Sequence, residues 1–125
     1  SGHLPHKEQV AQFNLVFFNE ILNVLQPDVT SSEAIDMYTS EENIFLDVRT
    51  KFEHNQSSIP NSILIPLNEL PQKIDELEKY RTKNIVVYCR VGNRSQFATK
   101  LLRDEGYHAT NLLGGIVDWE GPVKP

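Results

Sequence analysis

Residues 85–105 read IVVYCRVGNRSQFATKLLRDE and carry the strongest structural signal in the chain. The first four are an unbroken β-branched and aromatic run, which is typical of a parallel strand covered on both faces. Residues 94–105 show helical spacing. The apolar residues expected to face inward on this helix are Phe97, Ala98, Leu101 and Leu102. The stretch therefore predicts a strand, a short loop and a helix.

Outside this stretch, short apolar runs alternate with helical patterns. The runs that suit strands are residues 43–48, 63–65 and 111–113. The segments expected to be helical are residues 6–25, a helix capped by Ser31 or Ser32, a short helix or turn at 50–56, residues 67–80, and a short final helix carrying Trp119. This alternation predicts an α/β domain with a mostly parallel sheet and right-handed crossovers. Ligands bind beyond the carboxyl ends of such strands, and Cys89 is the first residue after residues 85–88.

Length and composition limit the functions to consider. The chain has 125 residues, 39% apolar and 23% charged, which fits one globular domain. Its net charge of −5 argues against nucleic acid as a partner. No stretch approaches the roughly 20 apolar residues of a membrane span, so we expect no membrane insertion. The single cysteine excludes an intramolecular disulfide and fits the cytoplasm, or the periplasm if a signal peptide was removed.

The first residues, Ser1-Gly2-His3, resemble an expression scar. We therefore divide the chain into a tag remnant with a helical extension, residues 1–26, and a main domain, residues 27–125. The apolar stripe of the extension comprises Val10, Phe13, Phe17, Ile21 and Val24. Such a stripe needs burial, so we expect it to pack on the domain itself, on a partner, or on a second copy as a homodimer.

The loop Cys89-Arg90-Val91-Gly92-Asn93-Arg94-Ser95 carries the chemistry. A loop between a strand and a helix can turn several backbone N–H groups toward one point, and the helix adds the positive end of its dipole. A thiolate beside these groups and two arginines should have a pKa below the free value of about 8.5. The pattern predicts a nucleophilic cysteine, whereas a lone cysteine without such a context is more often a small buried hydrophobe.

The loop resembles the active-site loop of single-domain rhodanese-like sulfurtransferases, in which Cys-Arg-x-Gly-x-Arg is a frequent form. Three further segments resemble the family in the family's order: Leu46-Asp47-Val48-Arg49 with Glu53 and Ile59-Pro60, then Ile65-Pro66-Leu67, then Leu113-Gly114-Gly115 with Trp119. The likeness covers about residues 28–123. Where the family usually has Gly-His-Ile-Pro-Gly-Ala, residues 57–62 read SSIPNS, which we interpret as a change in turn chemistry.

This resemblance implies a rhodanese-like fold, with about five mostly parallel strands flanked by helices and an extra N-terminal helix. It implies that Cys89 carries a sulfane sulfur as a persulfide, taken from thiosulfate or a persulfide donor and passed to a thiol or cyanide. The implied substrate-binding residues are Arg90, Val91, Gly92, Asn93, Arg94, Ser95 and Arg49, with Asp47 in support. Arg49 could instead pair with Asp47 or Glu53. No cofactor or metal is expected, because the histidines lack ligand spacing.

Two classes of function stay open at this point. The first is an enzyme of the thiosulfate sulfurtransferase kind. The second is a sulfur-relay or interaction module in which Cys89 receives persulfide sulfur from a protein partner, with little thiosulfate turnover. An inactive scaffold is disfavoured because Cys89 is present. Phosphatases of the related fold have five residues between cysteine and arginine, whereas four separate Cys89 from Arg94, and a smaller ring of amides suits sulfur better than phosphate.

Overall fold

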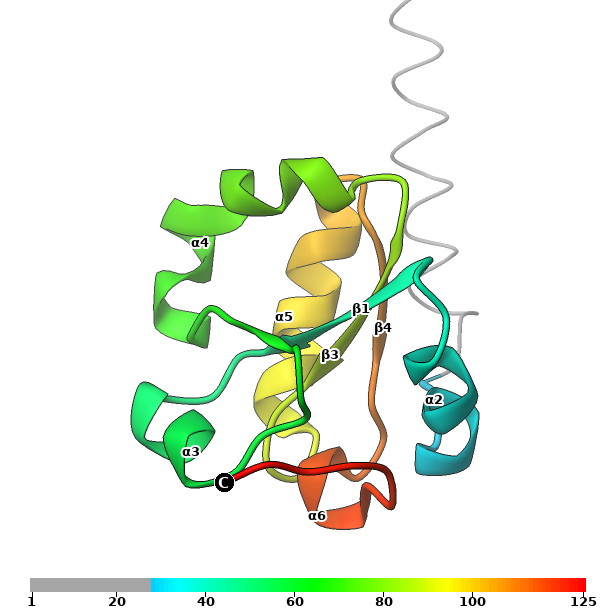
Figure 1. Cartoon of the computed structure of the whole chain (residues 1–125). Helices are drawn as coiled ribbons and strands as arrows, with labels where there is room; N and C mark the ends of the chain where they lie inside the picture. The colour runs from blue at the N-terminus through cyan, green and yellow to red at the C-terminus, as the bar shows by residue number, and fades with distance from the viewer. Residues whose placement is uncertain (1–27) are drawn as a thin grey trace, which may run out of the picture.

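The apolar run at residues 85–88 forms part of an inner strand of a parallel sheet (Figure 1). The computed structural model describes residues 28–125. The strands are β1 (Asn43–Asp47), β2 (Ile63–Leu64), β3 (Asn84–Tyr88) and β4 (His108–Asn111), in the spatial order β2-β1-β3-β4. All pairings are parallel, with Asp47 opposite Tyr88 and Val87 opposite Asn111. The carboxyl ends of β1, β3 and β4 therefore meet at one edge of the sheet.

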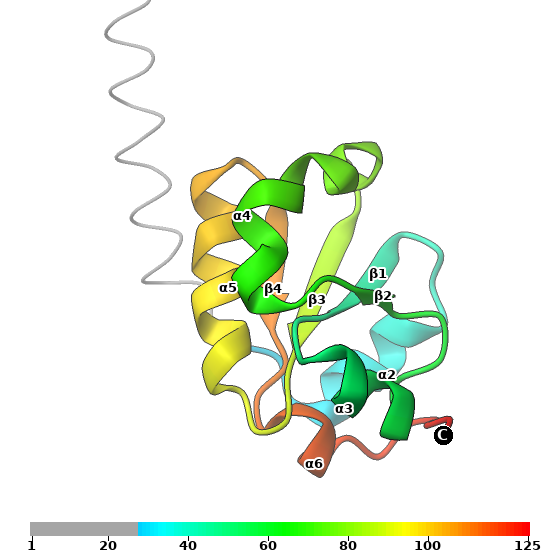
Figure 2. The same cartoon turned by 90° about the vertical axis from the view of Figure 1, so that its left-hand side faces the viewer.

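Helices cover both faces of this sheet, as Figures 1 and 2 show. They are α2 (Ser31–Tyr38), α3 (Lys51–Gln56), the 3-10 helix η1 (Leu67–Glu69), α4 (Leu70–Lys73), the 3-10 helix η2 (Ile74–Tyr80), α5 (Asn93–Asp104) and α6 (Gly115–Asp118). Helices α4 and α5 lie on one face and α2 on the other. The predicted α/β class with a parallel sheet is confirmed.

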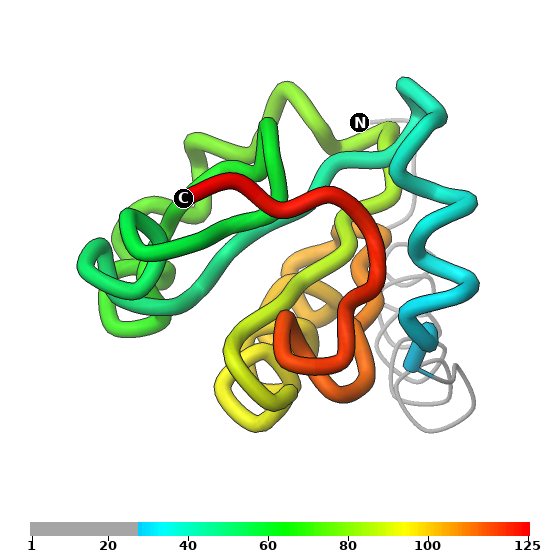
Figure 3. Tube along the Cα trace, turned by 60° about the horizontal axis from the view of Figure 1, so that its bottom comes forward, coloured from blue at the N-terminus to red at the C-terminus, as the bar shows by residue number. Residues whose placement is uncertain are grey.

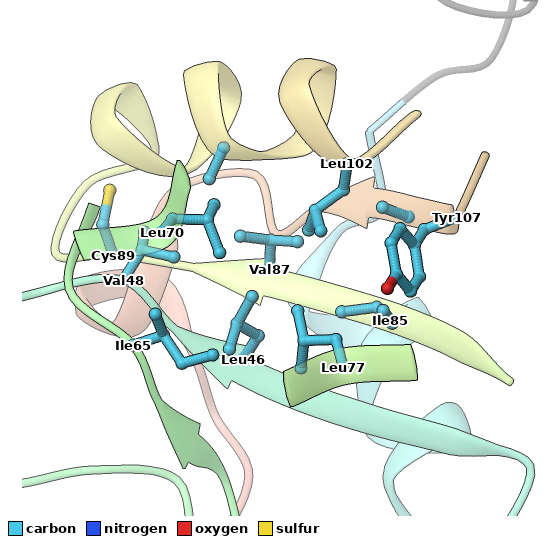
Figure 4. Packing of buried hydrophobic residues seen from close by; sticks show 12 residues of the cluster. Leu46, Val48, Ile65, Leu70, Leu77, Ile85, Val87, Cys89, Leu102 and Tyr107 are labelled. Carbon is cyan, nitrogen blue, oxygen red and sulfur yellow. The ribbon is translucent and has the colours of Figure 1, made fainter. Parts of the chain in front are cut away.

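Strand β3 divides its side chains between two cores because successive residues of a strand point to opposite faces. Ile85 and Val87 lie in the core beneath α4 and α5 (Figure 4). Val86 and Tyr88 lie in the second core, which includes Ala34 of α2. These four side chains are fully buried, whereas Asn84 at the start of the strand is exposed. This two-sided burial explains why the run is continuously apolar rather than alternating.

Capping boxes begin two of the helices. Thr30 accepts a hydrogen bond from the backbone N–H of Glu33, and the Glu33 carboxylate accepts one from the backbone N–H of Thr30. The expected cap at Ser31 or Ser32 is therefore wrong by one or two positions, since only residue 30 has the glutamate at the third position of the box. Thr50 and Glu53 repeat the arrangement at α3, which confirms a short helix there.

Three other expectations need correction. Within residues 28–125 the sheet has four strands, against the expected number of about five, and a single parallel bridge joins Val29 to Leu112 beyond β4. The last strand is residues 108–111 rather than 111–113, because its polar residues pair with β3. Residues 67–80 form η1, α4 and η2 in succession rather than one helix, although Leu70 and Leu77 do face the core as their spacing predicts.

Phe97 is 74% exposed, so its expected inward position on α5 is also wrong. The buried positions of α5 are Ser95, Ala98, Thr99 and Leu102, which follow the three- and four-residue spacing of one helix face. Phe97 falls outside that stripe. Two polar residues, Ser95 and Thr99, occupy inward positions that hydropathy alone assigns to solvent.

The turn after α3 shows how the segment at residues 57–62 departs from the family pattern. Asn61 has φ of 67°, the left-handed region in which asparagine is among the best tolerated residues after glycine. It therefore takes the conformation that glycine usually provides. Nearby, the C-terminal segment runs back from α6, and Ser58 pairs with Lys124 through two backbone hydrogen bonds of 2.9 Å (Figure 3).

The expected helix at residues 6–25 lies outside the described residues, and so does the division at residues 1–26. The proposal that this helix mediates a homodimer stays a prediction. Within residues 28–125, no helix is long and apolar enough to cross a membrane.

Tyr88 provides a test of the second core. Its hydroxyl accepts a hydrogen bond from the backbone N–H of Ile59 (3.1 Å) and bonds the Ser62 hydroxyl (2.8 Å). Burial raises the pKa of Tyr88 to about 12. We expect Tyr88→Phe to lower the free energy of unfolding by about 1–3 kcal/mol, because it leaves the Ile59 N–H buried and unpaired. Urea unfolding followed by the fluorescence of Trp119 measures this.

Tyr80→Phe is the matched control. Tyr80 is half-buried, and no hydrogen bond of its hydroxyl is found within residues 28–125. Its loss should change the free energy of unfolding by no more than about 0.5 kcal/mol. Equal destabilisation by the two substitutions would contradict the role given to the Tyr88 hydroxyl.

Candidate active site

Cys89 lies at the carboxyl end of β3, where the chain turns into α5. Its side chain ends the row of buried residues beneath α5 (Figure 4), and the residue is 1% exposed. Helix α5 begins at Asn93, so only three residues connect Cys89 to the helix. A strand, a tight loop and a helix N-terminus thus surround one sulfur atom, as the sequence predicts.

Backbone N–H groups converge on this sulfur. The Cys89 Sγ accepts hydrogen bonds from the N–H of Gly92 (3.1 Å) and of Ser95 (3.4 Å), and the Ser95 hydroxyl lies 3.4 Å away. The turn requires Gly92 to adopt φ of 108°, which is strained for a residue with a side chain. The loop therefore forms a ring of donors suited to an anionic sulfur.

The pKa of Cys89 lies below its ordinary value. Burial raises the pKa of the thiol, but hydrogen bonds to the sulfur, including those from the backbone N–H groups of Ser95, Gly92 and Val91, lower it by more. The balance favours the thiolate form, which is the nucleophilic one. This agrees with the direction expected from the sequence.

The segment after β4 supports the loop from outside. The N–H groups of Ile116 and Val117 donate to the carbonyls of Cys89 (2.9 Å) and Arg90 (3.1 Å). Gly115 fits so closely that a Cβ there would lie 2.3 Å from the Arg90 carbonyl oxygen. Because residue 115 lacks a side chain, the segment after β4 can pack directly against the backbone of the loop.

Two ion pairs lie beside the loop. Arg49 is 4% exposed and forms a bidentate pair with Asp47 (2.9 and 2.8 Å), and it also donates to the Ser57 carbonyl. His54 Nδ1 lies 2.8 Å from Asp47 Oδ2, the oxygen that also accepts a hydrogen bond from Arg49 Nη2. The structure thus places Arg49 with Asp47, which is one of the partners left open by the sequence, and the pair braces the end of β1.

Arg94 forms the second pair. Its guanidinium donates to both oxygens of Glu53 (2.7 and 2.9 Å). The Glu53 carboxylate and, to a lesser extent, the negative charge of Cys89 raise the pKa of Arg94. The Arg94 hydrogen bond holds the pKa of Glu53 well below its ordinary value, at about 2. Because Glu53 also caps α3, this ion pair ties that helix to the first turn of α5.

The other loop residues predicted to bind substrate are divided between the surface and the interior. Arg90, Val91 and Asn93 are exposed, whereas Gly92 and Ser95 are buried. Arg90 borders a groove of about 380 Å³. Its other lining residues are Arg49, Phe52, Glu53, Gln56, Ser57, Ile116, Val117 and Val123.

Asn111 is a site residue that sequence reasoning missed. It is 3% exposed at the end of β4, and its side-chain amide contacts Ser95, Gly92 and Asp28. Its position at the edge where three strands end could have pointed to it, had β4 been placed correctly. Within residues 28–125, no group of three or more histidine, cysteine or carboxylate side chains is arranged to hold a metal ion.

Comparison with known proteins agrees with this geometry. A family model described as the rhodanese-like domain matches residues 30–122. The chain belongs to the rhodanese-like domain family. The solved structure of a rhodanese-related protein from Thermoplasma volcanium superposes with a TM-score of 0.72 and 35% identity, covering 78% of this chain and 97% of that one. The predicted rhodanese-like fold is therefore confirmed.

Two relatives indicate the chemistry found in the family. A sulfurtransferase of Allochromatium vinosum is 37% identical over 81 residues, which cover 64% of this chain and 74% of that protein. The adenylyltransferase and sulfurtransferase uba4 of Ogataea parapolymorpha is 36% identical over 105 residues. The match covers 82% of this chain but spans only 26% of uba4. This rhodanese-like chain thus resembles both a protein of similar length and one region of a longer protein.

The Arg94–Glu53 pair makes stability depend on pH. Since the folded-state pKa of Glu53 is about 2, below the ordinary 4.5, its ionisation stabilises the fold above pH 4.5 and stops doing so as pH falls toward 2. We expect Glu53→Gln to cost roughly 1 kcal/mol at pH 7 after allowance for solvent screening, and almost nothing near pH 2. Urea unfolding at several pH values measures the difference.

Glu33→Gln is the control, because Glu33 occupies the same capping-box position in α2 without an ion-pair partner among the described residues. Its effect should change less between pH 7 and pH 2. If the two variants showed the same pH dependence, the Arg94 pair would not be the cause.

Proposed function

We propose that this rhodanese-like chain is a sulfurtransferase that carries a sulfane sulfur on Cys89 as a persulfide. The observation that carries the proposal is the buried Cys89 sulfur, which accepts N–H bonds from Gly92 and Ser95 at the start of α5. Relatives that carry the sulfurtransferase name support the same class of reaction. Thiosulfate or a small persulfide is the proposed donor, and a thiol or cyanide the acceptor.

In the first half-reaction the Cys89 thiolate attacks the outer sulfur of thiosulfate. A sulfur–sulfur bond forms at Cys89 as the sulfur–sulfur bond of thiosulfate breaks, and its electron pair leaves with sulfite. The site is suited to this step because its donors are backbone dipoles already in place. The first N–H groups of a helix have no intrahelical partner, so those of Asn93 and Arg94 are available to an incoming anion.

In the second half-reaction an acceptor thiolate or cyanide attacks the outer sulfur of the persulfide. The bond between the two sulfurs breaks, and its electron pair returns to Cys89 as the thiolate. This leaving group is good because the donors that lower the pKa of Cys89 also stabilise it as it departs. The same ring of N–H groups therefore serves both directions of transfer.

A protein partner is the alternative source or acceptor of the sulfur. Large apolar side chains near the loop are exposed: Phe52 by 72%, Val117 by 57%, Val123 by 48% and Val91 by 47%. Three of them line the groove beside Arg90. A cluster of this kind is typical of a protein-binding surface, which favours a relay in which Cys89 exchanges sulfur with a partner.

Intact-mass spectrometry after incubation with thiosulfate tests the enzymatic form of the proposal. We expect a gain of about 32 Da, one sulfur atom, that a thiol reductant removes. Cys89→Ser should show no gain, because Cys89 is the only cysteine of the chain. Circular dichroism of the variant confirms that its fold is kept.

The choice of donor separates the two forms. A gain with a persulfide donor but not with thiosulfate would favour the relay. No gain with either donor, in wild-type protein that remains folded, would contradict a persulfide on Cys89 altogether.

A further inference from the structure

One side-chain amide, that of Asn111, contacts two of the residues that donate to the Cys89 sulfur, Ser95 and Gly92. The Asn111 Oδ1 accepts a hydrogen bond from the Ser95 hydroxyl, and the Asn111 Nδ2 lies 3.3 Å from the Gly92 carbonyl oxygen. The same Nδ2 lies 3.3 Å from Asp28 Oδ2. Asn111 is 3% exposed and Ser95 is fully buried, so water does not compete readily for these groups.

The orientation of this amide follows from its partners. Both groups near the Nδ2 end, the Gly92 carbonyl and the Asp28 carboxylate, are acceptors. An amide turned the other way would place its oxygen against two oxygens and its NH₂ group toward Ser95. The acceptor end of Asn111 therefore faces Ser95.

Ser95 has a single hydroxyl proton to donate. If that proton goes to Asn111, then the hydroxyl oxygen presents a lone pair, and not a proton, to the Cys89 sulfur 3.4 Å away. We propose that Asn111 is a positioning residue that holds the Ser95 proton away from the Cys89 sulfur. The proposal rests on Cys89 being the nucleophile.

The arrangement acts differently on the two forms of Cys89. The neutral thiol can donate its S–H to the Ser95 oxygen, whereas the thiolate meets a lone pair and relies on the N–H groups of Gly92 and Ser95. Asn111 thus limits how acidic Cys89 becomes. This has a kinetic use, because the intrinsic nucleophilicity of a thiolate falls as its pKa falls.

Charged groups also face this site from each neighbouring element. They are Arg90 on the loop, Arg94 on α5, Asp47 at the end of β1, Arg49 after β1, Glu53 and His54 on α3, and Asp28 beside Asn111. A comparison confined to Ser95 and Asn111 leaves all of them in place. The coupling between the two substitutions then isolates the hydroxyl proton.

The test is the pH profile of alkylation of the single cysteine by iodoacetamide, in wild type, Ser95→Ala, Asn111→Ala and the double variant. When Asn111 is present, Ser95→Ala should shift the midpoint of the alkylation profile little, because the hydroxyl does not donate to the thiolate. Asn111→Ala should shift it about one pH unit lower, since the freed hydroxyl can then donate to the charged sulfur. Ser95→Ala added to Asn111→Ala should reverse that shift.

Two outcomes would overturn the proposal. One is a rise of about one pH unit caused by Ser95→Ala alone, which would mean that the hydroxyl already donates to the thiolate. The other is an equal effect of Ser95→Ala in both backgrounds. If Asn111→Ala does not fold, the first outcome still decides, because Ser95→Ala removes a single oxygen.

Asn84→Ala serves as the control for loss of an asparagine at a strand end. Asn84 lies at the other end of β3, where its amide bonds Asn43, and its loss should leave the profile unchanged. Alkylation needs no sulfur donor. Failure of this proposal is thereby distinguishable from failure of persulfide formation, which the mass measurement reports separately.

Discussion

The structure depends on hydrogen bonds from backbone N–H groups to one buried sulfur atom. For Gly92 and Ser95 to reach Cys89, β3 must end at residue 88, the loop must turn through a positive φ at Gly92, and α5 must begin at once. The two-sided burial of β3 fixes where the strand ends, and the inward stripe of α5 fixes the angle of the helix. The apolar core and the reactive site are therefore set by the same packing.

The loop is held from three sides by groups distant in sequence. Asn111 contacts its inner side, Ile116 and Val117 bind its carbonyls, and Glu53 holds the arginine of its helix. These contacts also neutralise charge, because Glu53 and Asp47 pair with the two nearest buried or half-buried arginines. The sulfur is thus stabilised chiefly by neutral dipoles at close range, because the charges of Arg49 and Arg94 are already balanced by carboxylates.

The local parts of this design are readable from the sequence, and the long-range parts are not. The strand at residues 85–88, the helix after it and the reactive Cys89 follow from continuous patterns within a few residues. Asn111 could not be identified as a site residue from the sequence, because its partners Ser95 and Gly92 lie in a distant segment of the chain. In addition, β4 contains polar residues, so hydropathy placed the strand at the wrong residues. Phe97 was misjudged for a related reason: Ser95 and Thr99 take inward positions through hydrogen bonds, which hydropathy does not register.

A ring of neutral donors suits the proposed transfer because the charge within it stays constant. A thiolate carries one negative charge before the first step, and a persulfide carries one after it, while the donor dianion arrives and the sulfite dianion departs. Fixed N–H dipoles that stabilise the first state then stabilise the second without rearrangement. What changes is the position of the charge, which moves from Sγ to the outer sulfur. Donors directed only at Sγ would favour the thiolate over the persulfide, so a hydroxyl held by Asn111 keeps the two states closer in energy.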